Sequence, residues 1–169
     1  SGAQEQTWAV LETGFVAANI LVQAATIVLT QSGETADVLN AMKRLIETTT
    51  DILVITNVPG STASRVGHHT AYTKAGPEVS VAATKTFIAQ LMAMYGLALS
   101  YPGVNHTIRE RLVSEIRQLP NKVQQVLDSE LQIASCARYL SRYEDALFIG
   151  RGINYPIALE GALKLKEIS

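Results

Sequence analysis

A short loop rich in hydroxyl and amide side chains, residues 30–35 (TQSGET), joins an apolar run to an amphipathic segment. The run at 26–30 predicts a buried strand, and the segment at 34–48 predicts a helix. Ligands of open α/β sheets bind where a parallel strand ends and the next helix begins. The first turn of a helix offers unpaired N–H groups and the positive end of the helix dipole. This loop could therefore hold a phosphate group without a Lys or an Arg.

The same loop also has a simpler interpretation as an ordinary helix cap, with Ser32 as the N-cap residue and Thr35 three residues further on. A cap needs one hydroxyl, whereas this loop has three hydroxyls and a glutamine. Both interpretations stay open on the residues alone. Nucleotide binding is not indicated, because Gly33 stands alone and the loop lacks the spaced glycines and the lysine of nucleotide-binding loops.

Two further segments contain residues that are suited to chemistry. Small residues at 75–85 (AGPEVSVAATK) run directly into a predicted helix, and small side chains let a backbone approach a ligand closely. The alternative is a tight loop packed under a neighbouring helix. Glu160, Lys164 and Glu167 share one helix face at i, i+4 and i, i+3 spacing. A carboxylate beside a lysine can act as a general base, but the spacing alone favours a solvent-facing ion pair.

The composition narrows the classes of function. Fourteen Lys and Arg against 15 Asp and Glu give a net charge of −1, which lacks the basic character that nucleic-acid binding needs. The single cysteine, Cys136, excludes an internal disulfide, and no His or Cys pattern has the spacing of a metal site. No apolar run reaches the ~18 residues of a membrane span, and no signal peptide is visible. We therefore expect a soluble, cytoplasmic protein with no metal site.

The apolar pattern also predicts the elements that must position these residues. The runs at 26–30 and 52–56 are apolar without alternation, so a parallel sheet covered by helices on both faces is expected. The other predicted elements are helices at 7–24, at 84–100, at 105–141 with an interruption at Pro120, and from Tyr155 onward, and short strands at 71–73 and 145–149. Strand, glycine-containing turn and helix thus occur twice, which suggests two related α/β units.

Three segments together resemble the isomerase part of the glutamine–fructose-6-phosphate aminotransferases. They are 31–37 (QSGETAD), 57–61 with 75–85 (NVPGS and AGPEVSVAATK), and 150–169 (GRGINYPIALEGALKLKEIS). In these enzymes that part is a tandem of sugar isomerase (SIS) domains, which implies a flavodoxin-like α/β fold, a three-layer αβα sandwich with a parallel sheet. QSGET is common to SIS domains, whereas ALEGALKLKEIS is much more specific to this family.

The resemblance covers residues 26–169 and implies a division of the chain. Residues 1–103 would be a first SIS domain with an atypical N-terminal part, residues 104–142 a helical connector, and residues 143–169 the start of a second SIS domain.

The resemblance also implies roles for individual residues. The family's phosphate loop follows the pattern S-Q-S-G-E-T, so the phosphate of fructose 6-phosphate would be bound by Thr30, Gln31, Ser32, Gly33 and Thr35. The backbone near Val81 would face the sugar, and a family serine falls on Ala83, which lacks that hydroxyl. Glu167 matches the glutamate that moves a proton between C1 and C2, and Lys164 matches an active-site lysine beside it.

The reaction implied by the resemblance is ketose–aldose isomerisation with an added nitrogen. Ammonia from glutamine hydrolysis in a separate glutaminase domain condenses with C2 of the opened sugar, and proton transfer by Glu167 yields glucosamine 6-phosphate. No metal or redox cofactor is required, and a homodimer is expected because SIS domains usually pair. The family's C-G-T-S turn, its ring-opening histidine in K-H-G-P and its C-terminal lysine are not in this sequence. We therefore expect the chain to bind sugar phosphate without completing the reaction alone.

Two other functions remain open. Another SIS enzyme, such as an amino-sugar phosphate deaminase or a fructosamine-phosphate deglycase, would share the loop and the base but take no ammonia from glutamine. A non-catalytic sugar-phosphate sensor would use the phosphate loop alone. A glutaminase domain beginning with cysteine upstream of this chain would favour the aminotransferase, and an upstream helix-turn-helix region would favour the sensor.

Overall fold

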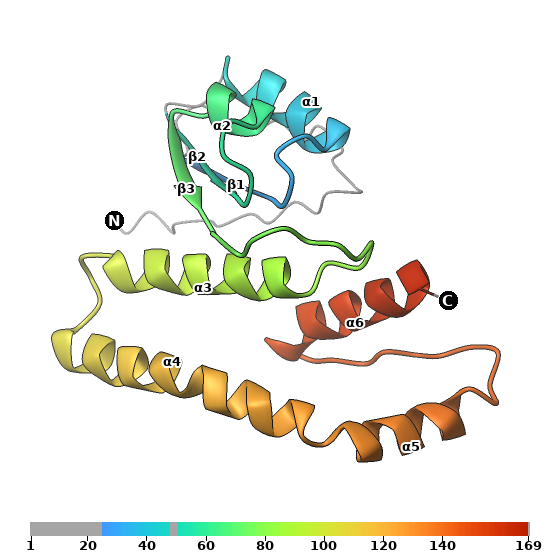
Figure 1. Cartoon of the computed structure of the whole chain (residues 1–169). Helices are drawn as coiled ribbons and strands as arrows, with labels where there is room; N and C mark the ends of the chain where they lie inside the picture. The colour runs from blue at the N-terminus through green and yellow to red at the C-terminus, as the bar shows by residue number, and fades with distance from the viewer. Residues whose placement is uncertain (1–24, 48–50, 169) are drawn as a thin grey trace. The chain divides into compact units, whose positions relative to one another are not determined.

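The computed structural model of the protein describes residues 25–47 and 51–168. Within these residues the chain forms three strands and six helices, in the order β1–α1–β2–α2–β3–α3–α4–α5–α6 (Figure 1). The chain divides into two compact units, residues 1–95 and 96–169. The helix predicted at 7–24 lies outside the described residues. The division into two SIS segments and a connector stays a prediction.

The first unit contains a sheet of three parallel strands. β1 (Thr26–Thr30) pairs with β2 (Ile52–Thr56), and β2 pairs with β3 (His69–Tyr72). The register places Thr30 opposite Thr56, so the carboxyl ends of these strands meet at one edge of the sheet. The predicted bounds of β1 and β2 are confirmed, because continuous β-branched and aliphatic runs of this length suit buried parallel strands.

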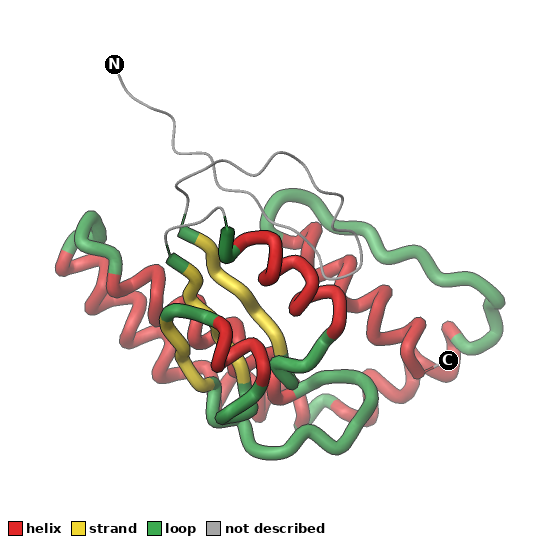
Figure 2. Tube along the Cα trace, turned by 90° about the horizontal axis from the view of Figure 1, so that it is seen from above, coloured by secondary structure: helices red, strands yellow, loops and turns green. Residues whose placement is uncertain are grey.

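Helices α1 (Ala36–Leu45) and α2 (Thr62–Val66) lie on the same side of the sheet (Figures 1 and 2). The core between them and the strands consists of Val28, Met42, Leu45, Ile52, Val54 and Ala63. Each large apolar side chain buried there contributes about 1.5–3 kcal/mol relative to leaving it in water. On the opposite face of β1, Ile27 and Leu29 are 45% and 43% exposed. The predicted α/β class with a parallel sheet is confirmed, and these two helices supply one helical layer.

The remaining helices are α3 (Lys85–Ser100), α4 (His106–Leu127), α5 (Glu130–Leu140) and α6 (Asn154–Ile168). The predicted interruption at Pro120 is wrong, because Pro120 lies inside α4. Pro120 is exposed, so water can hydrate the carbonyl group that loses its helical partner there. No helix in the described part of the chain is long and apolar enough to cross a membrane.

The strand predicted at 145–149 is also corrected, because this segment has no regular secondary structure and pairs with no strand among the described residues. Leu147 and Ile149 are each 90% exposed. An apolar run becomes a strand only when a neighbour accepts and donates its backbone hydrogen bonds. The ring of Phe148 instead lies against α6, where a Cβ added at Gly161 would come within 3.0 Å of it.

Candidate functional site

The loop after β1 is held by hydrogen bonds to its backbone. The Gln31 carbonyl accepts from the Asn57 N–H at 3.1 Å and from the Thr56 hydroxyl at 3.3 Å. The Gly33 carbonyl accepts from the Ala63 N–H at 3.0 Å. All three donors belong to the end of β2 or to the segment that follows it. The segment at and after the end of β2 therefore holds the main chain of the loop, and the side chains of Gln31 and Thr35 take no part in this.

Gly33 is required in this loop for two physical reasons. Its φ is +70°, in the left-handed region that favours glycine. A Cβ added there would lie 2.2 Å from the Oγ of buried Ser61, which is closer than side-chain atoms can approach. The Gly33 N–H donates to the Thr30 hydroxyl at 3.2 Å, and Thr30 is itself buried. Thr30 and Gly33 thus fix the shape of the loop through this hydrogen bond and through their packing inside the unit.

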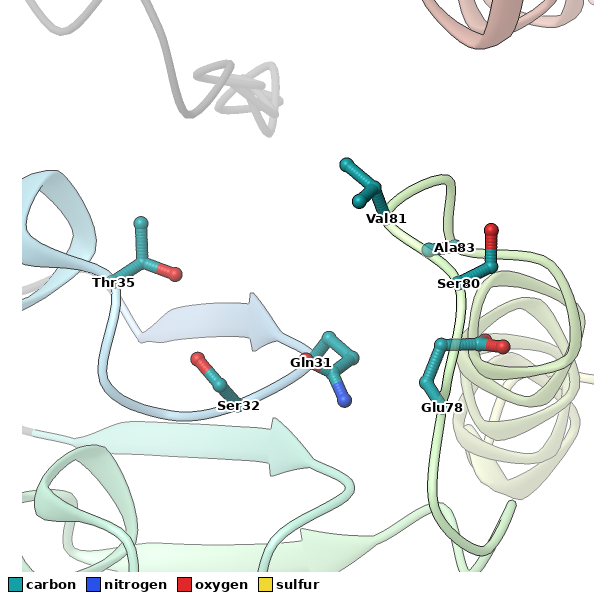
Figure 3. Close-up of a pocket in the computed structure, with 7 residues that line it drawn as sticks. All are labelled: Gln31, Ser32, Thr35, Glu78, Ser80, Val81 and Ala83. Atoms are coloured by element: carbon teal, nitrogen blue, oxygen red, sulfur yellow. The ribbon is translucent and has the colours of Figure 1, made fainter. Parts of the chain in front are cut away.

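A cavity of about 250 Å³ opens beside this loop (Figure 3). One wall carries Gln31, Ser32 and Thr35, and the other carries Glu78, Ser80, Val81 and Ala83. None of the described residues that line the cavity is a Lys or an Arg. An anion bound here would therefore depend on neutral donors and on the helix dipole.

The donors on the first wall are available to a ligand. The Ser32 hydroxyl accepts from the Glu34 N–H at 3.1 Å, which leaves its own proton free to donate. In the part of the chain that the structure describes, neither the Gln31 amide nor the Thr35 hydroxyl makes a hydrogen bond. Unpaired donors that converge on a cavity are what an anionic group requires.

The start of α1 bears on the interpretation of the loop as a helix cap at Ser32. Thr35 is the N-cap residue of α1, and its side chain makes no capping hydrogen bond. The predicted cap at Ser32 is therefore wrong, since Ser32 lies in the turn before the helix. The first N–H groups of α1 have no side-chain acceptor at the N-cap, and Thr35 itself lines the cavity. This geometry suits anion binding.

Glu34, the acidic residue of the loop, points to α2. Its carboxylate accepts from the Thr62 N–H at 2.7 Å and so caps the start of that helix. This hydrogen bond lowers the pKa of Glu34, with a smaller contribution from the charge of Arg65. The glutamate therefore ties the loop to the segment after β2 and does not line the cavity.

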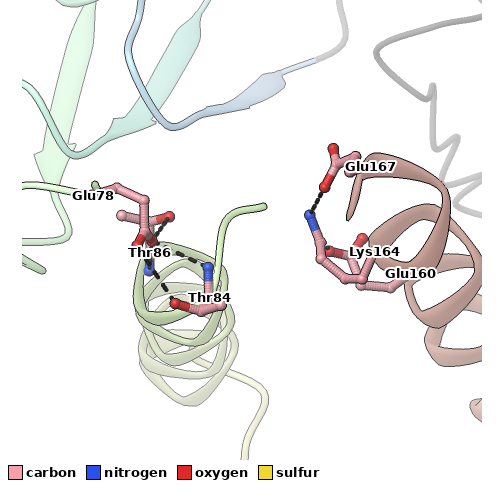
Figure 4. A network of polar contacts seen from close by, with 6 residues as sticks. All are labelled: Glu78, Thr84, Thr86, Glu160, Lys164 and Glu167. Carbon is pink, nitrogen blue, oxygen red and sulfur yellow. Dashed lines mark hydrogen bonds and ion pairs between the residues drawn. The ribbon is translucent and has the colours of Figure 1, made fainter. Parts of the chain in front are cut away.

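Glu78 anchors the second wall of the cavity to the first turn of α3 (Figure 4). Its Oε2 accepts from the N–H groups of Thr84 and Thr86, both at 3.1 Å, and from the Thr86 hydroxyl at 2.8 Å. The Thr84 hydroxyl donates to Oε1 at 3.4 Å. These hydrogen bonds, chiefly the one from the Thr86 N–H, lower the pKa of Glu78.

Asn57 anchors the start of the same loop. Its side-chain amide donates to the Gly76 carbonyl at 2.7 Å, and its Oδ1 accepts from the Thr73 hydroxyl at 2.9 Å and the Ala75 N–H at 2.8 Å. The loop that supplies Val81 and the rest of the second wall is thus held at both ends, by Asn57 and by Glu78.

The second unit holds an ionic cluster on α6 (Figure 4). Lys164 Nζ lies 2.7 Å from Glu167 Oε2 and 3.4 Å from Glu160 Oε1. These three side chains are only 25–28% exposed. The spacing alone favours a solvent-facing ion pair, whose side chains would be more exposed than this. The hydrogen bond to Glu167 and the charges of both carboxylates raise the pKa of Lys164.

Comparisons with known proteins agree with this geometry. The family model of the SIS domain matches residues 15–100, about half of the chain. The chain belongs to the SIS domain family. The SIS-domain part of the predicted resemblance is thereby confirmed.

This SIS chain is 46% identical over 151 residues to the glutamine–fructose-6-phosphate aminotransferase (isomerizing) of Methanosarcina acetivorans. It is 46% identical over 148 residues to the protein of the same name from Neisseria meningitidis serogroup A. Each match covers 85% of this chain and 24% of the relative, so the chain spans about a quarter of the length of these relatives.

A solved structure is also similar to the SIS chain. It is the C-terminal domain of glucosamine-fructose-6-phosphate aminotransferase from Francisella tularensis, with a TM-score of 0.81 and 35% identity. The likeness covers 85% of this chain and 42% of that one.

The structure brings some of the predicted site residues together. Five of them line the cavity described above: Gln31, Ser32, Thr35, Val81 and Ala83. Thr30 and Gly33 are not among the residues that line the cavity, and they bond to each other within the loop. Lys164 and Glu167 belong to the second unit.

Sequence reasoning missed Glu78 and Ser80 as lining residues. A signal for Glu78 was present, because it precedes a helix start with two threonines, Thr84 and Thr86. Within residues 25–47 and 51–168, no three His, Cys, Asp or Glu side chains gather as a metal site would require.

Proposed function

We propose that this chain is the sugar-phosphate isomerase part of a glutamine–fructose-6-phosphate aminotransferase. The whole enzyme would convert fructose 6-phosphate and glutamine-derived ammonia to glucosamine 6-phosphate. The observation that carries the proposal is the wall of free donors on Gln31, Ser32 and Thr35 at the start of α1. The names of the similar proteins favour this activity over a deaminase, a deglycase or a sensor.

The phosphate of the sugar would bind the first wall of the cavity. Ser32 and Thr35 would donate their hydroxyl protons, Gln31 its amide, and the start of α1 its free N–H groups. A helix N-terminus favours a nearby negative charge by about 0.3–2 kcal/mol. Thr30 and Gly33 would act by shaping the loop, since Thr30 is buried and bonded to the Gly33 N–H.

The sugar carbons would face the second wall. Val81 would present its backbone, and Ala83 would leave room where the family pattern has a serine. Val81 as a whole residue is 87% exposed, so a ligand can reach it. Small side chains on this wall let the sugar approach the backbone closely.

Glu167 would carry the proton transfer. Addition of ammonia to the C2 carbonyl, with loss of water, gives an imine. The Glu167 carboxylate would remove a proton from C1 while the imine nitrogen takes up a proton, which gives an enolamine. Return of the proton from Glu167 to C2, with loss of the O1 proton, leaves an amine at C2 and an aldehyde at C1. Lys164, 2.7 Å from Glu167, would hold that carboxylate in position. A glutaminase domain would supply the ammonia, and we propose a cytoplasmic homodimer.

A ligand titration tests the binding site. Fructose 6-phosphate, glucose 6-phosphate, fructose and inorganic phosphate are added to the chain, and its thermal unfolding is followed. A ligand at a hundredfold excess over its Kd adds about 2.7 kcal/mol to the free energy of unfolding. We expect stabilisation by both sugar phosphates but not by fructose, and at least tenfold weaker binding in Ser32→Ala.

The matched control for this titration is Ser64→Ala. Ser64 donates to the Ser61 carbonyl and does not line the cavity, so this variant should bind fructose 6-phosphate as the wild type does. Equal stabilisation by fructose and fructose 6-phosphate would contradict the proposed site. In the full-length protein, glutamine should support formation of glucosamine 6-phosphate from fructose 6-phosphate, whereas formation with free ammonia but not with glutamine would indicate another SIS enzyme.

A further inference from the structure

Two helices begin beside the cavity, and their N-termini differ. α1 begins after Thr35, whose side chain leaves the first N–H groups uncapped. α3 begins at Lys85, two residues after Ala83 of the second wall, and Glu78 already accepts hydrogen bonds from the Thr84 and Thr86 N–H groups. Either helix start could attract an anion on electrostatic grounds, but one of them already holds a carboxylate.

Glu78 fills the α3 end with a charged group that is firmly bonded. Four hydrogen bonds from two threonines converge on its carboxylate, two from backbone N–H groups and two from hydroxyls. Thr86, one of the two donors, is 1% exposed, so the contact is shielded from water on that side. A phosphate would have to displace this carboxylate or lie beside its negative charge.

We propose that Glu78 is a positioning residue that fixes the orientation of the sugar phosphate, because it closes the α3 end of the cavity to anions and leaves the α1 end open. The inference rests on the proposed function. The phosphate then has one place to bind, against Ser32 and Thr35, and the sugar carbons extend toward the second wall. Without the charge of Glu78, the phosphate could also bind at the start of α3, with the sugar reversed.

Glu78 also holds the loop of the second wall in place, and Asn57 provides a control for this effect. It holds the opposite end of the same loop through three hydrogen bonds, but it does not touch the start of α3. Asn57→Ala should therefore loosen the second wall and leave the Glu78 carboxylate on Thr84 and Thr86. A residue that only stiffens the loop should behave like Asn57, whereas a residue that excludes anions should not.

Amide NMR of the chain under titration with inorganic phosphate separates these cases. In the wild type, we expect phosphate to shift the N–H signals of residues 35–38 and to leave those of Thr84 and Thr86 unchanged. In Glu78→Gln, which keeps nearly the same shape without the charge, both sets should shift. Asn57→Ala should show the wild-type pattern, and Glu78→Asp, which keeps the charge, should restore it.

Kinetics of the full-length protein give a second readout. Reversed, unproductive binding should lower kcat and KM of Glu78→Gln by a similar factor, on the order of tenfold, whereas a loosened loop in Asn57→Ala should raise KM. The inference is overturned if phosphate shifts Thr84 and Thr86 in the wild type, or if Glu78→Gln leaves them unshifted. Failure of the proposed function shows separately, as unchanged fructose 6-phosphate binding in Ser32→Ala.

Discussion

The cavity loop of the first unit and the ionic cluster of the second satisfy their polar groups in opposite ways. In residues 31–35 the backbone is engaged by the segment after β2, while the side chains of Gln31 and Thr35 make no hydrogen bond among the described residues. In α6 the side chains of Glu160, Lys164 and Glu167 bind one another. The loop therefore keeps side-chain donors available for a ligand, whereas the charged groups of the cluster already have partners.

This difference matches the two tasks that the proposed function requires. Recognition of a phosphate needs donors that are fixed in place and unoccupied, and a rigid backbone supplies them. Proton transfer needs a carboxylate that can gain and lose a proton while it stays in position, and a neighbouring ammonium group supplies that constraint. The predictions below disturb one arrangement or the other, starting with the largest expected effect.

Glu167→Gln in the full-length protein should remove the proposed proton-transfer group of the cluster and keep its shape. We expect kcat for glucosamine 6-phosphate formation to fall about 10²–10⁴-fold, because general acid–base catalysis contributes that much. Fructose 6-phosphate binding should be nearly unchanged. Glu160→Gln, which leaves the 2.7 Å Lys164–Glu167 contact intact, should lose tenfold or less. Wild-type kcat in Glu167→Gln would contradict the assigned role.

Gly33→Ala should break the loop of the first unit. The left-handed backbone costs about 1–2 kcal/mol and the crowding against Ser61 a further 1–3 kcal/mol, so we expect a loss of about 2–5 kcal/mol in urea unfolding. Gly60→Ala is the matched control, because Gly60 has a φ of +73° but nothing within 4 Å of an added Cβ. It should lose only the backbone part. Equal losses in both variants would show that Ser61 is not in the way.

Glu34→Gln tests the tie between the loop and α2 through its pH dependence. The pKa of Glu34 is lowered in the folded protein, so its carboxylate stabilises the fold above the unfolded pKa. That contribution disappears as the pH falls through the lowered folded value. The stability difference between wild type and Glu34→Gln should therefore be largest near pH 7 and shrink below an ordinary Glu pKa of 4.5. Unfolding at several pH values measures it, and a difference that grows in acid would contradict the contact.

Lys164→Gln should have the smallest effect on stability, about 0.5 kcal/mol, because ion pairs along one helix contribute little. The pKa of Lys164 is raised in the folded protein, so its contribution is complete below the unfolded value of 10.5 and is lost as the pH rises through the folded one. Unfolding of both proteins at pH 8 and above pH 11 checks this sign. A loss above about 2 kcal/mol in the free energy of unfolding would contradict this estimate and would mean that the ionic cluster is needed for α6 to fold.

The sequence pattern predicts well the strands and helices whose formation depends on their own residues. The bounds of β1 and β2 follow from two apolar runs, and α3 and α6 follow from the segments after 84 and 154. α2 was missed because its five residues depend on Glu34, which caps it from a distant part of the sequence. The expected strand at 145–149 failed for the same kind of reason, since pairing is not a property of the segment itself.

The site residues show the same contrast between local motifs and distant contacts. The loop motif predicts Gln31, Ser32 and Thr35 as site residues, and these three line the cavity, because a polar turn between a strand and a helix has a local signature. It does not reveal that Thr30 faces inward, because that depends on the turn at Gly33. Nor does it reveal Glu78, whose role depends on hydrogen bonds to residues six and eight positions further on.

A crystal structure of the chain with fructose 6-phosphate bound tests the central claim most directly. We predict the phosphate against the first wall, with its oxygens within hydrogen-bond distance of the Ser32 and Thr35 hydroxyls and the start of α1. The Glu78 carboxylate should remain on Thr84 and Thr86. A phosphate at the start of α3, or a sugar phosphate bound outside this cavity, would contradict the account.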